Sequence, residues 1–98
     1  MEVKAERVES FDTLKQPGQF ILTSRIGKDA HTGMLFVCPC GCGEMGGISF
    51  DVPEAEGLSG PKWQWDGDEH SPTVKPSIRK VGGCGWHGYL TAGVFVQC

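Results

Sequence analysis

The stretch Cys38-Pro39-Cys40-Gly41-Cys42-Gly43 places three thiols within five residues. Side chains two apart on a regular strand share one face, but they stand too far apart to meet at a single ion. The chain must therefore curl here, and it can, because proline fixes φ and glycine tolerates positive φ. Two more cysteines, Cys84 and Cys98, lie near the end of the chain, and Cys84 belongs to the glycine-rich stretch 82–88. We interpret these two stretches as halves of one site.

A shell of four thiolates is typical of a closed, structural zinc site, so the sequence predicts structural zinc. The favoured ligands are Cys38, Cys40, Cys42 and Cys84. His87 in place of one cysteine, or Cys98 in place of Cys84, are alternatives. Free buried thiols or disulfides are another, although a disulfide between such close neighbours would be strained. An iron–sulfur centre also accepts cysteine ligands, but the paired Cys-x-His and Cys-x-x-His boxes of a Rieske site are missing.

Size and composition favour one small, turn-rich domain. Its 98 residues include fifteen glycines and six prolines, which leave little room for long helices. The core must be small, so a metal staple would contribute much of the stability. Five cysteines is an odd number, and three are too crowded to pair, so we expect metal-bound thiols in a reducing, cytoplasmic setting.

The charge balance argues against nucleic acid and membrane partners. The formal net charge is −3, and four zinc thiolates would take it to about −5. Nucleic-acid binding favours a basic surface, so a nucleic-acid-binding zinc knuckle is disfavoured. No apolar run approaches membrane-spanning length, and the charged residues 1–6 do not resemble a signal peptide.

Alternating and apolar runs predict a small, mainly-β sheet or half-barrel of about six or seven short strands. Residues 1–16 are expected to form an N-terminal arm or short helix, and residues 17–98 the zinc-binding β domain, which begins at the turn Pro17-Gly18. His31 is expected in a solvated loop, and Trp63 and Trp65 on one core-facing side of a strand. The expected strands are 19–26, 34–37, 48–52, 62–66, an irregular or edge segment 72–78, 78–81, and a closing hairpin of 88–91 and 94–97.

Ser77 and His87 form a candidate catalytic pair. A serine hydroxyl needs an adjacent base to act as a nucleophile, and histidine is the usual base. An antiparallel return between the two residues would bring them together, and His87 follows the expected ligand Cys84 by three residues. Glu44 and Asp66 are candidates to orient the histidine, and backbone N–H groups of the glycine-rich turns could form an oxyanion hole. His70 is a weaker candidate base, because its turn setting favours exposure.

These motifs together resemble a small bacterial and phage family, long catalogued as a domain of unknown function and in part mislabelled as ammonia monooxygenase. The matching marks are Pro17-Gly18, the apolar strand into residues 38–43, Trp63 or Trp65, Pro76-Ser77-Ile78, and Cys84 with His87 and Leu90. The family's members in bacterial ubiquitination-like operons are the BubE-type proteins, which look like unusual serine peptidases.

The resemblance implies a serine hydrolase that cleaves the C-terminal tail or the conjugates of a ubiquitin-like protein. Ser77 would be its nucleophile and His87 its base, with zinc as scaffold. The resemblance does not assign a third catalytic member, for which Glu44 is our own candidate. The implied setting is the bacterial cytoplasm, or the host cytoplasm for a phage-encoded copy. The rival hypothesis is a non-catalytic, zinc-stabilised adaptor, and the distance between Ser77 and His87 discriminates the two.

Overall fold

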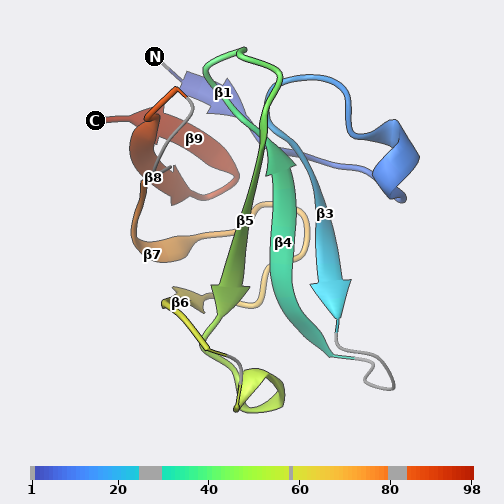
Figure 1. Cartoon of the computed structure of the whole chain (residues 1–98), viewed down its shortest axis with the longest axis vertical. Helices are drawn as coiled ribbons and strands as arrows, with labels where there is room; N and C mark the ends of the chain where they lie inside the picture. The colour runs from blue at the N-terminus through green and yellow to red at the C-terminus, as the bar shows by residue number, and fades with distance from the viewer. Residues whose placement is uncertain (1, 25–29, 58, 80–83) are drawn as a thin grey trace.

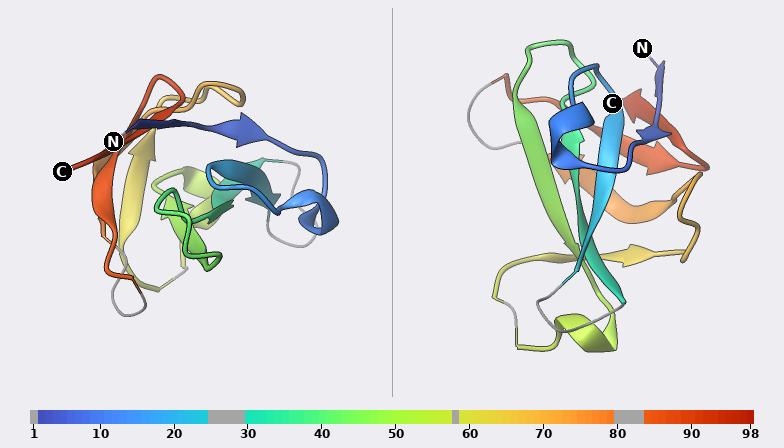
Figure 2. Two further views of the ribbon diagram at one scale, coloured as in Figure 1. Left: turned by 90° about the horizontal axis from the view of Figure 1, so that it is seen from above. Right: turned by 90° about the vertical axis from the view of Figure 1, so that its right-hand side faces the viewer.

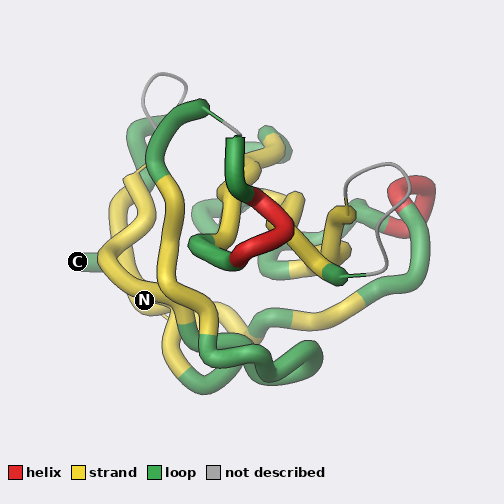
Figure 3. Tube along the Cα trace, turned by 90° about the horizontal axis from the view of Figure 1, so that it is seen from below, coloured by secondary structure: helices red, strands yellow, loops and turns green. Residues whose placement is uncertain are grey.

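The computed structural model describes residues 2–24, 30–57, 59–79 and 84–98, and these fold into a mainly-β domain (Figure 1). Two short 3-10 helices, η1 and η2, interrupt the strands, as Figure 3 shows. The elements are β1 (Glu2–Lys4), β2 (Glu6–Arg7), η1 (Phe11–Thr13), β3 (Gln19–Ser24), β4 (His31–Val37), β5 (Met45–Phe50), η2 (Pro53–Ala55), β6 (Lys62–Trp65), β7 (Val74–Arg79), β8 (His87–Thr91) and β9 (Val94–Gln97). No described helix is long and apolar enough to cross a membrane.

The nine strands form one nearly closed, barrel-like sheet in the order β1-β9-β8-β7-β6-β5-β4-β3-β2. Residues 2–7 close it, because β1 pairs with β9 at one end of this order and β2 pairs with β3 at the other. Figure 2 shows this segment crossing between the two ends of the sheet. Gly18 permits the crossing: its φ is +88°, and a Cβ there would lie 2.6 Å from the Lys4 carbonyl oxygen. The closure requires close backbone approach, which only glycine allows.

The mainly-β prediction is confirmed, and the strand count is higher than expected. The segment 1–16 was expected as an arm or short helix; its described part, from residue 2, contains strands β1 and β2 and the 3-10 helix η1. The closing hairpin is confirmed, with Ala92 and Gly93 both at positive φ. Three predicted features lie outside the described residues: the strand ends at residues 25–26 and 80–81, and the glycines 82–83.

One local prediction is wrong, and of another only one alternative is confirmed, because strands pair further than their sequences indicate. His31 begins β4 instead of lying in a solvated loop, and its ring packs edge-on against Trp65. Segment 72–78 is not at a sheet edge, because β7 pairs with both β6 and β8. Its predicted irregularity is real: between Val74 and Ile78, the register against β8 shifts, and the Lys75–Pro76 peptide bond is cis.

Aromatic side chains fill the barrel. Phe20, Phe36, Phe50 and Phe95 are all fully buried. The half-buried Trp63 and Trp65 pack against this core, as predicted, and Trp65 stacks on Phe50 with ring centroids 4.5 Å apart. Burial of such rings is the main apolar contribution to stability in so small a domain.

Gly46 carries a fold constraint that gives a testable prediction. A Cβ at Gly46 would lie 2.6 Å from the ring of the buried Phe36, whereas one at Gly47 would meet only the end of the flexible Leu35 side chain, at 2.9 Å. We expect Gly46→Ala to destabilise the domain by about 1–3 kcal/mol, the usual cost of overpacking, and Gly47→Ala to cost much less. Urea unfolding of the two variants measures this, and equal midpoints would contradict it.

Candidate functional site

The segment 38–44 curls tightly between β4 and β5. The Cys38 N–H donates to the Glu44 carbonyl at 2.8 Å, and the Gly41 N–H donates to the Cys38 carbonyl at 3.2 Å. Gly41 and Gly43 have φ of +89° and +84°, in the left-handed region that favours glycine. The expected curl is therefore present, and it turns the three cysteine side chains toward one another.

Cys84 reaches the same point from the other half of the chain. The sulfurs of Cys38, Cys40, Cys42 and Cys84 all lie within 4.8 Å of one another. The Sγ of Cys38 is 3.3 Å from that of Cys40 and 3.4 Å from that of Cys84. Cys38 is buried and the other three are exposed. These four residues are the predicted ligand set, and they form a possible metal site.

The spacing of the four sulfurs fits a metal ion. Bonds of about 2.3 Å in a tetrahedron put sulfurs about 3.8 Å apart. Burial raises the pKa of the Cys38 thiol well above its usual range, whereas a hydrogen bond from the Trp86 backbone lowers the pKa of Cys84 to about 7. Clustered thiols held this way are suited to bind a thiophilic cation in place of their protons.

Ser77 and His87 lie in hydrogen-bond contact. The Ser77 Oγ is 2.9 Å from the His87 Nε2. Ser77 sits where the β7 register shifts, and His87 is the first residue of β8, directly opposite Arg79. Both side chains are half-buried. A hydroxyl and an imidazole at this distance are close enough for a proton to pass from one to the other.

Trp63 contacts this pair, and Trp86 directly precedes His87 in the sequence; neither tryptophan was predicted to have a role at the site. The Trp63 Nε1 donates to the Ser77 carbonyl at 3.1 Å, which fixes the backbone at the shifted register. Trp86, between Cys84 and His87, is buried and packs edge-on against Phe95. The position of Trp86 between Cys84 and His87 in the sequence could have indicated a role at the site. The contact of Trp63 with Ser77 could not be predicted in this way, because it depends on the pairing of β6 with β7.

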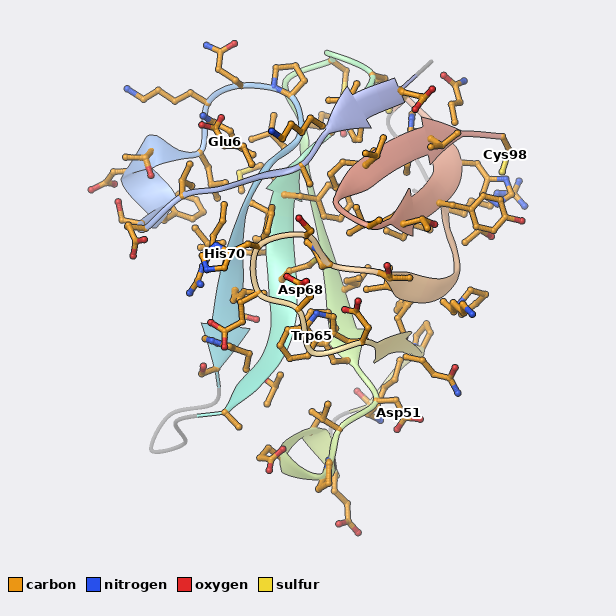
Figure 4. All side chains as sticks on the ribbon, turned by 180° about the vertical axis from the view of Figure 1, so that it is seen from behind. Glu6, Asp51, Trp65, Asp68, His70 and Cys98 are labelled. Carbon is orange, nitrogen blue, oxygen red and sulfur yellow. The ribbon has the colours of Figure 1, made fainter. Side chains whose placement is uncertain are left out.

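The other candidate residues have different surroundings. Glu44 is the exposed last residue of the curl, where its carbonyl accepts from the Cys38 N–H; its catalytic role stays a prediction. The Asp66 Oδ1 accepts from the backbone N–H groups of Asp68 and Thr73. His70 is exposed in that same loop, at the opposite side of the molecule from Cys98 in Figure 4.

Cys98 is outside the four-cysteine cluster. Its N–H donates to the His87 carbonyl at 3.0 Å, which extends the pairing of β8 with β9 to the chain's last residue. The alternative with Cys98 as the fourth ligand is therefore not the arrangement in the structure. His87 also lies outside the cluster, with its Nε2 turned to Ser77.

Fold and site together define a small barrel-like domain with a four-cysteine cluster and a hydrogen-bonded serine–histidine pair. Residues 5–98 match the sequence model of the BubE family, described as bacterial ubiquitination-like system serine protease, and the chain belongs to this family. Comparison with curated proteins gave no match, and comparison with solved structures gave none.

Proposed function

We propose that this protein is a serine peptidase that cleaves the C-terminal tail or the conjugates of a ubiquitin-like protein, in the cytoplasm. The observation that carries the proposal is the 2.9 Å contact between the Ser77 Oγ and the His87 Nε2. Side chains lying far apart, or a buried Ser77, would have favoured the adaptor hypothesis. Membership of the BubE family supports both the reaction and the ubiquitin-like partner.

In this proposal, Ser77 attacks the scissile carbonyl while the His87 Nε2 takes the hydroxyl proton. His87 then gives that proton to the leaving amine, and the C–N bond breaks to leave an acyl ester on Ser77. Water, deprotonated by His87, hydrolyses the ester and restores the serine. Glu44 is our candidate for orienting His87, and backbone N–H groups near residues 84–88 are candidates to stabilise the oxyanion.

We propose that zinc occupies the four-cysteine cluster and has a structural role. An all-cysteine shell leaves no open position for substrate, in contrast to catalytic zinc sites. The cluster joins the loop before β5 to the loop before β8, and β8 begins with His87. The metal would thus hold the base at a fixed position relative to the rest of the barrel.

A fluorophosphonate probe tests the nucleophile, because it reacts with activated serines. We expect the parent protein to be labelled at Ser77, as located by peptide mass spectrometry, and Ser77→Ala to remain unlabelled. Ser59→Ala is a matched control, since Ser59 is an exposed loop serine that should not affect labelling. Labelling of Ser77→Ala at the parental rate would overturn the assignment.

A further inference from the structure

The sheet is open between β5 and β7 on one side of β6. β6 pairs with β5 only at Ser49 and Phe50, and with β7 only at Val74 and Lys75. Among the described residues, no strand lies between residues 45–48 of β5 and residues 77–79 of β7. Figure 1 shows β6 beside only the lower end of β5. A cavity of about 290 Å³ lies in this opening, lined by Phe36, Gly46, Gly47, Ile48, Trp63, Ile78 and Arg79.

Backbone groups of β5 face this opening. The Asp51 N–H donates to the Trp63 carbonyl at 2.7 Å, so the backbone groups of Asp51 point toward β6. On a strand, alternate residues direct their N–H and C=O to the same side, so Ser49 and Gly47 point the same way. Ser49 meets Lys62 of β6, whereas Gly47 lies beyond the start of β6. Gly47 therefore presents a donor and an acceptor to the opening.

Backbone groups of β7 face it from the other side. The His87 carbonyl accepts from the Cys98 N–H, so the backbone of His87 points to β9 and away from β7. Arg79, its register partner, must then direct its N–H and C=O away from β8. Continuing the registers of β6 places Arg79 at the level of Gly47, and Ser77 at the level where β6 begins.

We propose that this opening, which we call the β5–β7 slot (residues 46–48 and 77–79), binds the substrate as an extended peptide in line with β6. The proposal rests on the proposed peptidase function and adds how the substrate is held. The peptide backbone would bond to Gly47 on one side and to Arg79 on the other, as in strand addition to a sheet edge. Such a strand would end beside Ser77, where its carbonyl meets the nucleophile.

The slot also sets the chemistry of the peptide. Successive side chains of a strand point to opposite faces, so every second residue would face the floor formed by Phe36, Trp63 and Ile78. The cavity must hold the backbone too, which leaves room for small residues there. The outward residues would lie beside the exposed Arg79, with Lys75 on the other side of Ser77. Because both of these side chains are positively charged, they favour acidic residues in the peptide. The occupant is therefore an extended peptide with small residues facing inward and acidic residues facing outward.

Binding to the Ser77→Ala protein tests the slot without any need for cleavage. The probe is a fluorescein-labelled octapeptide in which glycine and glutamate alternate, and the readout is fluorescence anisotropy. On this background, Gly47→Pro removes the N–H that faces the slot, whereas Gly47→Ala keeps it and meets only the flexible end of Leu35. We expect Gly47→Ala to bind within about twofold of its parent and Gly47→Pro about tenfold more weakly, since a peptide carbonyl loses its donor.

A second series decides the matter even if Gly47→Pro does not fold. The same octapeptide carrying N-methyl groups on alternate residues cannot form the backbone hydrogen bonds to β5 and β7. On the protein with an unchanged slot, it should therefore bind about tenfold more weakly than the unmethylated peptide. Replacing the glycines with leucine should weaken binding as well. Equal binding of methylated and unmethylated peptides, or no binding of either, overturns the slot. Binding without cleavage by the wild-type protein contradicts the peptidase proposal instead.

Discussion

Removal of the proposed zinc should lower the melting temperature of this domain by at least about 15 °C. The core is small, and the two loops that carry the cysteines are joined to each other through the cluster. Structural zinc contributes on the order of 10 kcal/mol in small zinc folds, which is comparable with the whole stability of a domain. Because a change of about 1 kcal/mol in the free energy of unfolding shifts the melting temperature of such a domain by about 4–8 °C, loss of even part of the zinc contribution gives a large shift.

Thermal unfolding followed by circular dichroism, with and without a strong chelator, measures this effect. Cys38→Ser should reproduce it, because Cys38 is the buried member of the cluster. Cys98→Ser is the matched control: it makes the same substitution at an exposed cysteine outside the cluster and should unfold like the parent. Elemental analysis should find one zinc per chain, absent from Cys38→Ser. An unchanged melting temperature after chelation would contradict the structural role.

The position of the cluster explains why a metal that takes no part in the chemistry would still matter for activity. It joins the loop before β5 to the loop before β8, so it links the start of one wall of the β5–β7 slot to a segment that follows the other wall in the chain. Without that link, only the short β6 and the pairing around the rest of the barrel would set the spacing of β5 and β7. Loss of the metal should therefore reduce substrate binding as well as stability.

The features that the sequence predicted well depend on local patterns of residues or on ligand chemistry. The curl at residues 38–44 follows from its own glycines and proline, and the β8–β9 hairpin follows from the turn at Ala92 and Gly93. The meeting of Cys84 with the curl was inferred from ligand chemistry, which needs a fourth sulfur. Each of these depends on a few neighbouring residues or on one strong chemical requirement.

Long-range pairing accounts for what was missed. β1 and β2 are only three and two residues long, and they exist because residues 2–7 lie between the two ends of the sheet. The start of β4 at His31 similarly depends on its partners in β3. The Trp63 contact with Ser77 and the opening between β5 and β7 need the register of three strands, which no local pattern contains.

The serine and the histidine should act as one unit, so that neither retains much activity without the other. We expect Ser77→Ala and His87→Ala each to lower kcat/KM for a ubiquitin-like substrate by at least about 10³-fold, and the double variant to be no slower than the slower single variant. The physical reason is the 2.9 Å contact, because a serine without a base is a weak nucleophile and a base without the serine has no proton to take.

Matched variants separate this effect from damage to the fold. His70→Ala removes an exposed histidine from the β6–β7 loop and should leave kcat/KM unchanged. Glu44→Gln should lower it less than His87→Ala, because an orienting group contributes less than the base itself. Melting temperatures should stay near the parental value in Ser77→Ala, since only one half-buried hydroxyl is lost. Additive losses in the double variant would show that the two side chains act independently and would exclude the nucleophile–base pair.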